Sequence, residues 1–444
     1  MTIGDFSRKS IILVGLLVPM LFWSFQLKDE VRGESLQSFY TIKAKRFLVK
    51  HDVIWDYVEI NNRWIDIFAS PDDKKNNIPE CRLYWDEVGV FNTIVKKFRY
   101  EDAFATYKNK GTSRFDSLLI AQTSIIPTEK VIVNAKLPLA GKRIAIDPGH
   151  VGNDFQMGLI ESRFVKMDLG DEKIEFSEAE LTFATAYLLK DMLEAQGAEV
   201  ILTRTSCNTS SLGISFSEWY KTRMDGDLIE AVNSGKISKE FADWLKNEAS
   251  EAKVFQKFFQ TLDWRERCKI INDFRPDLTL IIHYNADEEN YTWSKPTTKN
   301  YNVAFVGGGY VKDELLKEED RFQFLRQLVS TDIENSVKLS GSIVKCFENC
   351  LKVPTMTKKD ESNSIKNFSL PTSQKGVYAR NLALTRYILG PICYGESLLQ
   401  DNIQECRALN KRDLDYPCGK TSSRVKDVAT AYYKGIFEYL KINN

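Results

Sequence analysis

Hydrophobic runs that stop at turn residues mark the strands predicted for the chain after residue 140. Residues 144–146 are apolar and end at Asp147-Pro148-Gly149-His150, and residues 276–285 repeat this design around His283. Proline and glycine interrupt such runs, so both segments are predicted to be buried strands that end in turns. Open α/β sheets place their ligand sites at the carboxyl ends of strands. Two of the three histidines in the chain therefore stand where a site is expected.

A helix and a second strand follow the first of these histidines. Ser177 and Glu180 have the spacing of a capping box, and the apolar residues after them recur at helical intervals up to Gly197. Glu178 falls in the first turn of this helix, where the helix dipole alone also favours a carboxylate. Residues 198–204 then predict a strand, so the segment forms a βαβ unit with a right-handed crossover.

The remaining pattern continues this alternation of strands and helices. It predicts an inserted helical segment at 210–262, helices at 263–274, 321–351 and 425–440, strands at 302–309 and 387–395, and a polar loop at 358–374. The region 321–351 holds one or two helices, and the last strand ends at Glu396. Alternating elements of this kind predict an α/β fold with an open, mostly parallel sheet flanked by helices.

The N-terminal segment has the pattern of an export signal. Arg8 and Lys9 precede an apolar stretch at residues 11–25. This stretch is shorter than the roughly 20 residues that a membrane-spanning helix needs. Bulky aromatic residues crowd its end, so cleavage and retention as an anchor both stay open. We therefore expect residues 1–27 to direct the chain to the periplasm or cell envelope, either released or anchored to the inner membrane.

Residues 28–138 are predicted to form a smaller β-rich or α+β accessory domain of unknown role. Apolar and polar residues alternate at 47–53 and 64–68, as they do in half-buried strands. His51 has no obvious ligand partner here, and we interpret it as a surface or hydrogen-bonded histidine. Residues 139–444 are predicted to be the catalytic domain, with the helical insertion at about 208–260.

Composition narrows the range of partners but leaves the cysteines undecided. Lysine plus arginine equals aspartate plus glutamate, so the formal net charge is zero and no nucleic-acid partner is predicted. A content of 43% hydrophobic and 27% charged residues is ordinary for a globular protein. Eight cysteines permit disulfides in an exported chain, but their spacing dictates none, and Cys346 and Cys350 either pair or pack on one helix.

Four residues at the ends of predicted elements carry the expected chemistry: His150, Glu178, His283 and Glu396. Two imidazoles and one carboxylate are the ligand type of a catalytic zinc that keeps one position open for water. Such a zinc acidifies its water and polarises a carbonyl, and a further carboxylate can pass the proton to a leaving amine. This chemistry describes amide hydrolysis, but the order of the residues alone does not decide which glutamate binds the metal.

Six segments follow one another in an informative order. They are Asp147-Pro-Gly-His150, Glu178 with the apolar helix after it, Gly197 with Thr203-Arg204, Arg267-x4-Asn272, Ile281-Ile-His-Tyr-Asn285, and Glu396 followed by Asn402. In this order they resemble the zinc-dependent N-acetylmuramoyl-L-alanine amidases of the amidase 3 family. The resemblance covers residues 142–444, with insertions near 208–260 and 308–375.

This resemblance implies a function and assigns residues to it. It implies a Zn²⁺ ion on His150, Glu178 and His283, with Glu396 as the catalytic acid/base. It implies hydrolysis of the amide bond between N-acetylmuramic acid and L-alanine in peptidoglycan, during wall remodelling, daughter-cell separation or lysis, and it is compatible with an activator protein. Further residues are interpreted as structural or as supports of the ligands: Asp147, Arg267, Asn272, Asn285 and Asn402.

Two other kinds of function stay open. A zinc carboxypeptidase, or another amidase that acts on cell-wall peptides, would use the same metal chemistry and differ only in its substrate contacts. A wall-binding or regulatory protein with an amidase fold would need no chemistry at all. The four intact residues of the predicted site argue against this last alternative.

Overall fold

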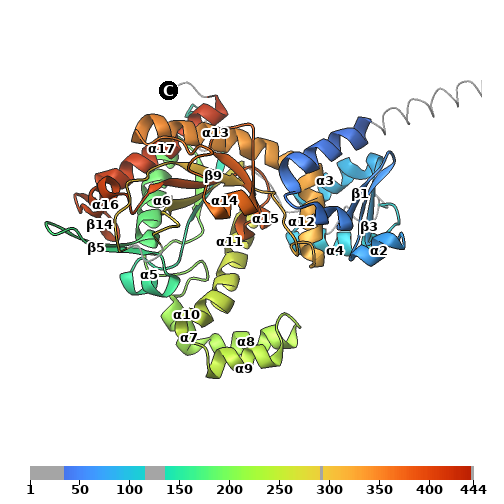
Figure 1. Cartoon of the computed structure of the whole chain (residues 1–444), viewed down its shortest axis with the longest axis horizontal. Coiled ribbons are helices and arrows are strands. Elements are labelled where there is room, and N and C mark those ends of the chain that lie inside the picture. The colour runs from blue at the N-terminus through green and yellow to red at the C-terminus, as the bar shows by residue number, and fades with distance from the viewer. Residues whose placement is uncertain (1–34, 116–135, 291–293, 442–444) are drawn as a thin grey trace, which may run out of the picture. The chain divides into compact units, whose positions relative to one another are not determined.

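The computed structural model describes residues 35–115, 136–290 and 294–441 of the 444-residue chain (Figure 1). The chain divides into two compact units, and each contains two stretches of sequence. The first unit comprises Met1–Ser124 and Val311–Val329, and the second comprises Ile125–Tyr310 and Ser330–Asn444. The second unit contains all four residues that carry the predicted chemistry.

A seven-stranded sheet in the order β10-β11-β9-β12-β8-β4-β7 forms the centre of the second unit. Its strands are β4 (Arg143–Pro148), β7 (Glu199–Leu202), β8 (Leu278–Asn285), β9 (Val303–Val306), β10 (Ser369–Pro371), β11 (Val377–Arg380) and β12 (Ile392–Leu399). The neighbours β12, β8, β4 and β7 run parallel, as do β11 and β9, whereas β9 is antiparallel to β12 and β10 to β11. The predicted open, mostly parallel sheet is confirmed.

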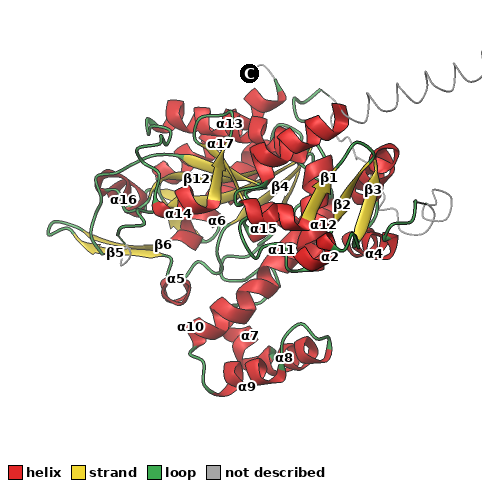
Figure 2. Cartoon of the chain, turned by 45° about the vertical axis from the view of Figure 1, so that its right-hand side comes forward, coloured by secondary structure: helices red, strands yellow, loops and turns green. Residues whose placement is uncertain are grey.

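Helices flank this sheet (Figure 2). Three long helices are α6 (Glu178–Glu194), α13 (Asp332–Leu351) and α17 (Ser423–Leu440). Helix α17 packs on both α6 and α13, with α6 against β4 and β8 and α13 against β9 and β12. Helix α11 (Gln260–Phe274) packs against β4 and against the short helix α15 (Ala383–Tyr387). The sheet strand β8 is buried along nearly its whole length, as expected for a strand that is covered on both faces.

Shorter elements complete the second unit and correct part of the sequence prediction. They are α14 (Asn363–Phe368), α16 (Ile403–Asn410), and the hairpin of β13 (Leu414–Tyr416) and β14 (Gly419–Thr421). Helix α14 and strand β10 lie where a polar loop is predicted at 358–374. That prediction is wrong for these elements, because Ser362 caps α14 by accepting from Ile365 N–H, and Ile365 is buried.

The βαβ unit of β4, α6 and β7 is present, but the segment between β4 and α6 is more ordered than its sequence suggests. It contains helix α5 (Phe155–Glu161) and the antiparallel hairpin of β5 (Phe164–Asp168) and β6 (Lys173–Ser177). Ser177 caps α6 by accepting from the Glu180 N–H at 3.2 Å. The carboxylate of Glu180 contacts Arg412 instead of closing the predicted capping box.

The predicted helical insertion consists of four helices and a π-helical turn. They are α7 (Phe216–Thr222), α8 (Met224–Asn233), α9 (Lys239–Asn247), α10 (Glu251–Val254) and the turn Phe255–Phe259, which continues into α11. These helices share a buried apolar cluster that includes Trp219, and Val151 and Met157 of the segment after His150 belong to the same cluster. The insertion therefore packs beside the predicted site, while α8 and α9 extend away from the sheet (Figures 1 and 2).

The first unit has a three-stranded antiparallel sheet in the order β1-β2-β3, accompanied by helices. Its elements are the π-helical turn Ala44–Leu48, the 3₁₀ helix Asp52–Tyr57, β1 (Val58–Ile60), β2 (Trp64–Ile67), α2 (Pro71–Lys75), β3 (Cys81–Tyr84), the 3₁₀ helix Trp85–Glu87, α3 (Val88–Lys97), α4 (Tyr100–Lys110) and α12 (Glu318–Val329). The strand predicted at 64–68 is present. The strand predicted at 47–53 is wrong, because short helical turns bury Ile54 and Tyr57 three residues apart.

Helix α12 belongs to the first unit, although its sequence lies among elements of the second. The ring of Phe322 contacts those of Phe91, Tyr100, Phe104 and Tyr107 from α3 and α4. Arg321 Nε lies 3.0 Å from Glu80 Oε2, next to β3. The region 321–351 thus contains two helices, α12 and α13, which belong to different units.

The described residues contain no helix that is both long enough and apolar enough to cross a membrane. The export segment predicted at residues 1–27 lies outside the described residues.

Candidate metal centre

The turn after β4 brings His150 to the edge of the sheet. A Cβ atom added to Gly149 would stand 2.4 Å from His283 Cε1, so only glycine fits at that position. His150 has a φ of 66°, a left-handed conformation that costs a non-glycine residue about 1 kcal/mol. Contacts from other elements must therefore hold this turn.

Arg267 of α11 is the first buried residue that holds the turn. Its Nη1 lies 2.9 Å from Asp147 Oδ1 and donates to the Pro148 carbonyl at 2.8 Å. The same guanidinium donates to the carbonyl of His150 and pairs with Asp263 one helical turn away. Asp147 and Arg267, both predicted to support the site, thus form one buried ion pair under the turn that carries His150.

Arg204 is a second buried residue of this kind, and no role for it is predicted from the sequence. Its Nη2 donates to the carbonyls of Gly149 and Ala179, both at 3.2 Å. Ala179 lies in the first turn of α6, so Arg204 ties the turn after β4 to the start of that helix. Burial lowers the pKa of Arg204 to about 10, and the positive charge of Arg267 acts in the same direction.

Three side chains from three elements meet beside this turn. His150 Nε2 lies 3.0 Å from Glu178 Oε1, His283 Nδ1 lies 3.0 Å from the same oxygen, and the two nitrogens are 3.1 Å apart. Glu178 is the first residue of α6, and His283 lies within β8. The structure therefore brings together the three residues that the sequence assigns to a metal.

The geometry of these three atoms suits a tetrahedral metal ion. Lone pairs of two imidazole nitrogens and a carboxylate oxygen repel one another at about 3 Å unless positive charge stands between them. Tetrahedral zinc with bonds of about 2.0–2.1 Å spaces its ligands by about 3.3 Å. The observed separations of 3.0–3.1 Å are close to this value. Among the described residues, this group could hold a metal ion.

The pKa values of two of these side chains favour positive charge beside Glu178, whereas burial lowers the pKa of His283. Burial acts to lower the pKa of His150, but the carboxylates of Glu178 and Glu161 outweigh it and raise that pKa to about 9. Burial acts to raise the pKa of Glu178, but His150 and His283 outweigh it and hold that pKa well below its usual range. Glu178 is therefore ionised at neutral pH, as a metal ligand must be.

Each ligand side chain is held by a partner that the sequence did not reveal. Glu178 Oε1 accepts from the Tyr284 N–H and its Oε2 from Gln400 Nε2, both at 3.1 Å. The ring of His283 stacks on Tyr394, with ring centres 4.5 Å apart and planes at 5°. His150 Nδ1 lies 3.0 Å from Glu161 Oε2.

Glu396 lies beside this group without joining it. It is directly opposite His283 in the register of β12 and β8, and both residues line one cavity of about 460 Å³. Burial raises the pKa of Glu396 to about 8, and the negative charge of Glu178 adds to the effect. The sequence predicts that the last strand ends at Glu396. Strand β12 instead continues to Leu399, so Glu396 lies inside the strand.

Comparison with known proteins finds a family model that matches part of the second unit. Residues 144–223 match the Amidase_3 family model, described as N-acetylmuramoyl-L-alanine amidase. The matched segment includes His150 and Glu178 and ends within the helical insertion, so His283 and Glu396 lie beyond it.

One curated relative and several solved structures are similar to the chain. The germination-specific N-acetylmuramoyl-L-alanine amidase of Bacillus subtilis (strain 168) is 27% identical over 195 residues, which span 44% of this chain and 57% of the relative. The CwlD amidase from Clostridioides difficile, solved in complex with the GerS lipoprotein, is 18% identical with a TM-score of 0.37, covering 68% of this chain and 100% of its own. Ami1 from Mycobacterium abscessus is 14% identical with a TM-score of 0.36, at the same coverage.

The cavity beside the ligand group is lined by both charged and apolar side chains. Its charged residues are the basic Arg163, Arg267 and Arg380 and the acidic Glu161, Glu178, Asp263, Asp287, Glu288 and Glu396. Tyr301, Phe305, Met356, Ile365 and Tyr394 line the cavity and belong to or pack on one apolar cluster. A substrate with both polar and apolar parts would match this lining.

Three asparagines that the sequence predicts to be structural or to support the ligands make contacts of different kinds. Asn272 bridges two backbone groups before β12, donating to the Tyr387 carbonyl and accepting from the Leu389 N–H. Asn402 caps α16, and Asn285 lines the cavity and accepts from the N–H of its neighbour Ala286. These contacts give Asn272 and Asn402 no part in the cavity.

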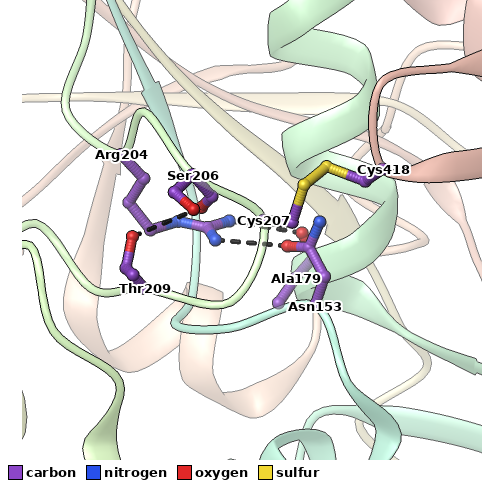
Figure 3. The surroundings of a disulfide bond; sticks show 7 residues. All are labelled: Asn153, Ala179, Arg204, Ser206, Cys207, Thr209 and Cys418. Carbon is purple, nitrogen blue, oxygen red and sulfur yellow. Dashed lines mark hydrogen bonds between the residues drawn. A yellow bond between two sulfur atoms is a disulfide. The ribbon is translucent and has the colours of Figure 1, made fainter.

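A disulfide joins Cys207 to Cys418 (Figure 3). It links the loop after β7, which carries Arg204, to the hairpin of β13 and β14. Cys346 and Cys350, for which the sequence leaves both pairing and packing open, are not bonded to each other, and both are free cysteines. The disulfide therefore fixes the loop that contains Arg204, which donates to the carbonyl of Gly149 in the turn after β4.

Proposed function

We propose that this protein is a zinc-dependent N-acetylmuramoyl-L-alanine amidase that hydrolyses the bond between N-acetylmuramic acid and L-alanine in peptidoglycan. The observation that carries the proposal is the ligand group of His150, Glu178 and His283, which faces Glu396 in one cavity of the second unit, part of which matches the Amidase_3 family model. The Bacillus subtilis relative bears the name of this activity and supports the same substrate class.

The proposed chemistry divides the work among four side chains. His150 Nε2, Glu178 Oε1 and His283 Nδ1 would hold the zinc, which when bound supplies Lewis acidity toward a carbonyl oxygen and acidifies a water. The carboxylate of Glu396 would take a proton from the attacking water and give it to the leaving amine. A carboxyl whose pKa is raised toward neutrality suits both halves of this transfer.

Two arginines in the cavity lining supply positive charge for acidic groups of the proposed substrate. Arg380 donates to Ser364 Oγ at 2.7 Å, and its guanidinium lies 5.2 Å from the ring centre of Phe305. Arg163 and Arg380 both line the cavity, and both act to lower the pKa of Glu396. Peptidoglycan stem peptides carry carboxylates that such charges would attract.

The proposal includes export to the cell envelope. The disulfide between Cys207 and Cys418 supports it, because such bonds form and persist in oxidising compartments outside the cytosol. Whether residues 1–27 are removed or anchor the chain to the inner membrane is decided by sequencing the amino terminus of the purified native protein.

Digestion of purified peptidoglycan by the zinc-loaded protein tests the proposal. We expect new amino termini on L-alanine and release of whole stem peptides, read by end-group labelling and mass spectrometry. Glu396→Gln, which keeps the shape of the side chain, should retain zinc and lose about 10²–10⁴-fold in rate, because the proton carrier is gone. Asp415→Asn, whose side chain is 86% exposed on the β13–β14 hairpin, should match the parent.

Other products would point elsewhere. Release of terminal D-alanine would indicate a carboxypeptidase, and no product from folded, zinc-loaded protein would indicate a wall-binding role. Full activity of Glu396→Gln would contradict its assignment as acid and base.

A further inference from the structure

Glu161, the last residue of α5, faces the back of the metal-binding histidine. It is 8% exposed. One carboxylate oxygen, Oε2, lies 3.0 Å from His150 Nδ1, and the other, Oε1, accepts from the Val151 N–H at 2.8 Å. The carboxylate thus lies against the histidine ring with one oxygen and accepts from the backbone beside it with the other.

Glu161 contacts Nδ1 of the His150 ring, on the side away from the proposed metal, so Glu161 is not itself a metal ligand. His150 offers Nε2 to Glu178 and His283, whereas Glu161 lies at the opposite nitrogen. An imidazole that binds a metal through one nitrogen carries its proton on the other, and a carboxylate there fixes both the tautomer and the ring orientation.

His150 needs such a partner more than His283 does. The ring of His283 is stacked on Tyr394, and Gly149 lies against it. The ring of His150 meets His283 only edge-on, with centres 4.7 Å apart and planes at 81°. It also stands on a turn whose φ of 66° is unusual for a residue with a side chain. Packing and backbone alone therefore leave the His150 ring less constrained.

The segment that carries Glu161 is built to stay in place. Asp154 caps α5 by accepting from the Met157 N–H at 2.7 Å. A Cβ atom added to Gly158 would stand 2.9 Å from Ser177 Cβ, so α5 packs tightly against the residue that caps α6. Met157 is also buried in the apolar cluster of the helical insertion. The carboxylate is thus presented from a fixed short helix.

We propose that Glu161 is a positioning residue that holds the proton on His150 Nδ1 and so keeps Nε2 free for the metal. The inference rests on the proposed zinc centre and extends it by one side chain. It also explains a role of the segment between β4 and α6, because helix α5 of this segment carries Glu161.

Glu161→Gln separates this role from packing. The amide has nearly the same shape as the carboxylate, but it has only one acceptor oxygen for two donors. If its NH₂ group turns toward the ring, it donates to Nδ1 and moves the histidine proton to Nε2, the metal-facing nitrogen. We expect zinc affinity to fall about 10–100-fold, measured by competition with a chromophoric chelator.

A second variant and a control sharpen the result. Glu161→Asp keeps a carboxylate on a shorter arm, so the proposed role predicts tighter zinc binding than in Glu161→Gln, whereas a packing role predicts the reverse order. Glu175→Gln changes an exposed residue of β6 in the same excursion and should leave zinc affinity unchanged. Thermal unfolding of the zinc-free proteins checks that each variant folds.

The outcomes are distinct from those that test the function. A folded Glu161→Gln protein that binds zinc within threefold of the parent overturns the inference, and so does Glu161→Gln binding more tightly than Glu161→Asp. A parent that binds zinc but releases no stem peptide refutes the proposed amidase activity and leaves the role of Glu161 standing. A parent that binds no zinc refutes both.

Discussion

The lack of a side chain at Gly149 allows the rings of His150 and His283 to lie close together. Gly149 has no side chain, and the ring of His283 occupies the space where a Cβ would be. Tyr394 closes the other face of that ring. The position of His283 Nδ1 therefore depends on the absence of one carbon atom in the turn after β4.

Gly149→Ala should accordingly damage the centre more than the fold. The new methyl group would displace the His283 ring, because its nearest ring atom stands at 2.4 Å. We expect zinc affinity to fall at least tenfold, measured by chelator competition. The matched control is Gly226→Ala in α8, where an added Cβ meets nothing within 4 Å and alanine favours the helix. Unchanged zinc binding in Gly149→Ala would show that the ring can move without cost.

The sequence revealed some residues of the site and concealed others for a physical reason. His150 and His283 stand out because histidine is rare in this chain and both follow or end apolar runs. Glu161 lies in a segment without clear periodicity, where a buried carboxylate and a solvated one look alike. Gln400 and Tyr394 act through contacts between strands, and no local pattern encodes those contacts.

The loop after β7 helps to hold the turn that carries His150. The loop after β7 carries Arg204, which binds the carbonyl of Gly149, and the disulfide of Cys207 with Cys418 fixes the same loop to the β13–β14 hairpin (Figure 3). The disulfide and Arg204 thus both constrain the loop after β7.

Removing the disulfide should lower stability. We expect the double variant Cys207→Ser/Cys418→Ser to lose about 2–4 kcal/mol in the free energy of unfolding, because the bond closes a long loop of the unfolded chain. Denaturant unfolding followed by tryptophan fluorescence measures this loss. Cys350→Ser removes a free thiol and serves as the control. Equal midpoints for the double variant and the parent would refute the expectation.

Predictions of elements succeeded where hydrophobic periodicity was long and failed where it was short. The strand at β8 and the helix at α6 follow from extended patterns that packing reinforces. Residues 47–53 show only a short alternation of apolar and polar residues. The π-helical and 3₁₀ turns in this region also bury apolar side chains, so the short pattern did not distinguish them from a strand. The short helix α14 was hidden in a polar stretch because it buries only Ile365.

The division of the whole molecule into units does not follow the order of the chain. Helix α12 lies between β9 and α13 in sequence, yet it completes the apolar core of the first unit through Phe322. The sequence groups α12 with the catalytic domain, because a local pattern reveals an amphipathic helix but not the distant surface it packs on.

A chain that begins at residue 139 should therefore behave poorly. It would retain α12 without α3 and α4, leaving Phe322 and the other buried apolar residues of α12 without their partners. We expect such a chain to aggregate in size-exclusion chromatography with light scattering. Replacing residues 311–329 of the same truncated chain with a glycine–serine linker of equal length should restore a monomer. A monomeric truncated chain that keeps α12 would contradict this view.

The membership of α12 also bears on how such a protein can change over generations. An accessory domain joined by one linker can be exchanged by a single recombination event, because its core is contiguous in the gene. Here a crossover between the two units would transfer most of the first unit without the helix that completes it. A newly acquired N-terminal domain would then meet an orphan helix already encoded downstream. Replacement of this accessory unit requires two coordinated genetic changes, so we expect it to be inherited together with the second unit.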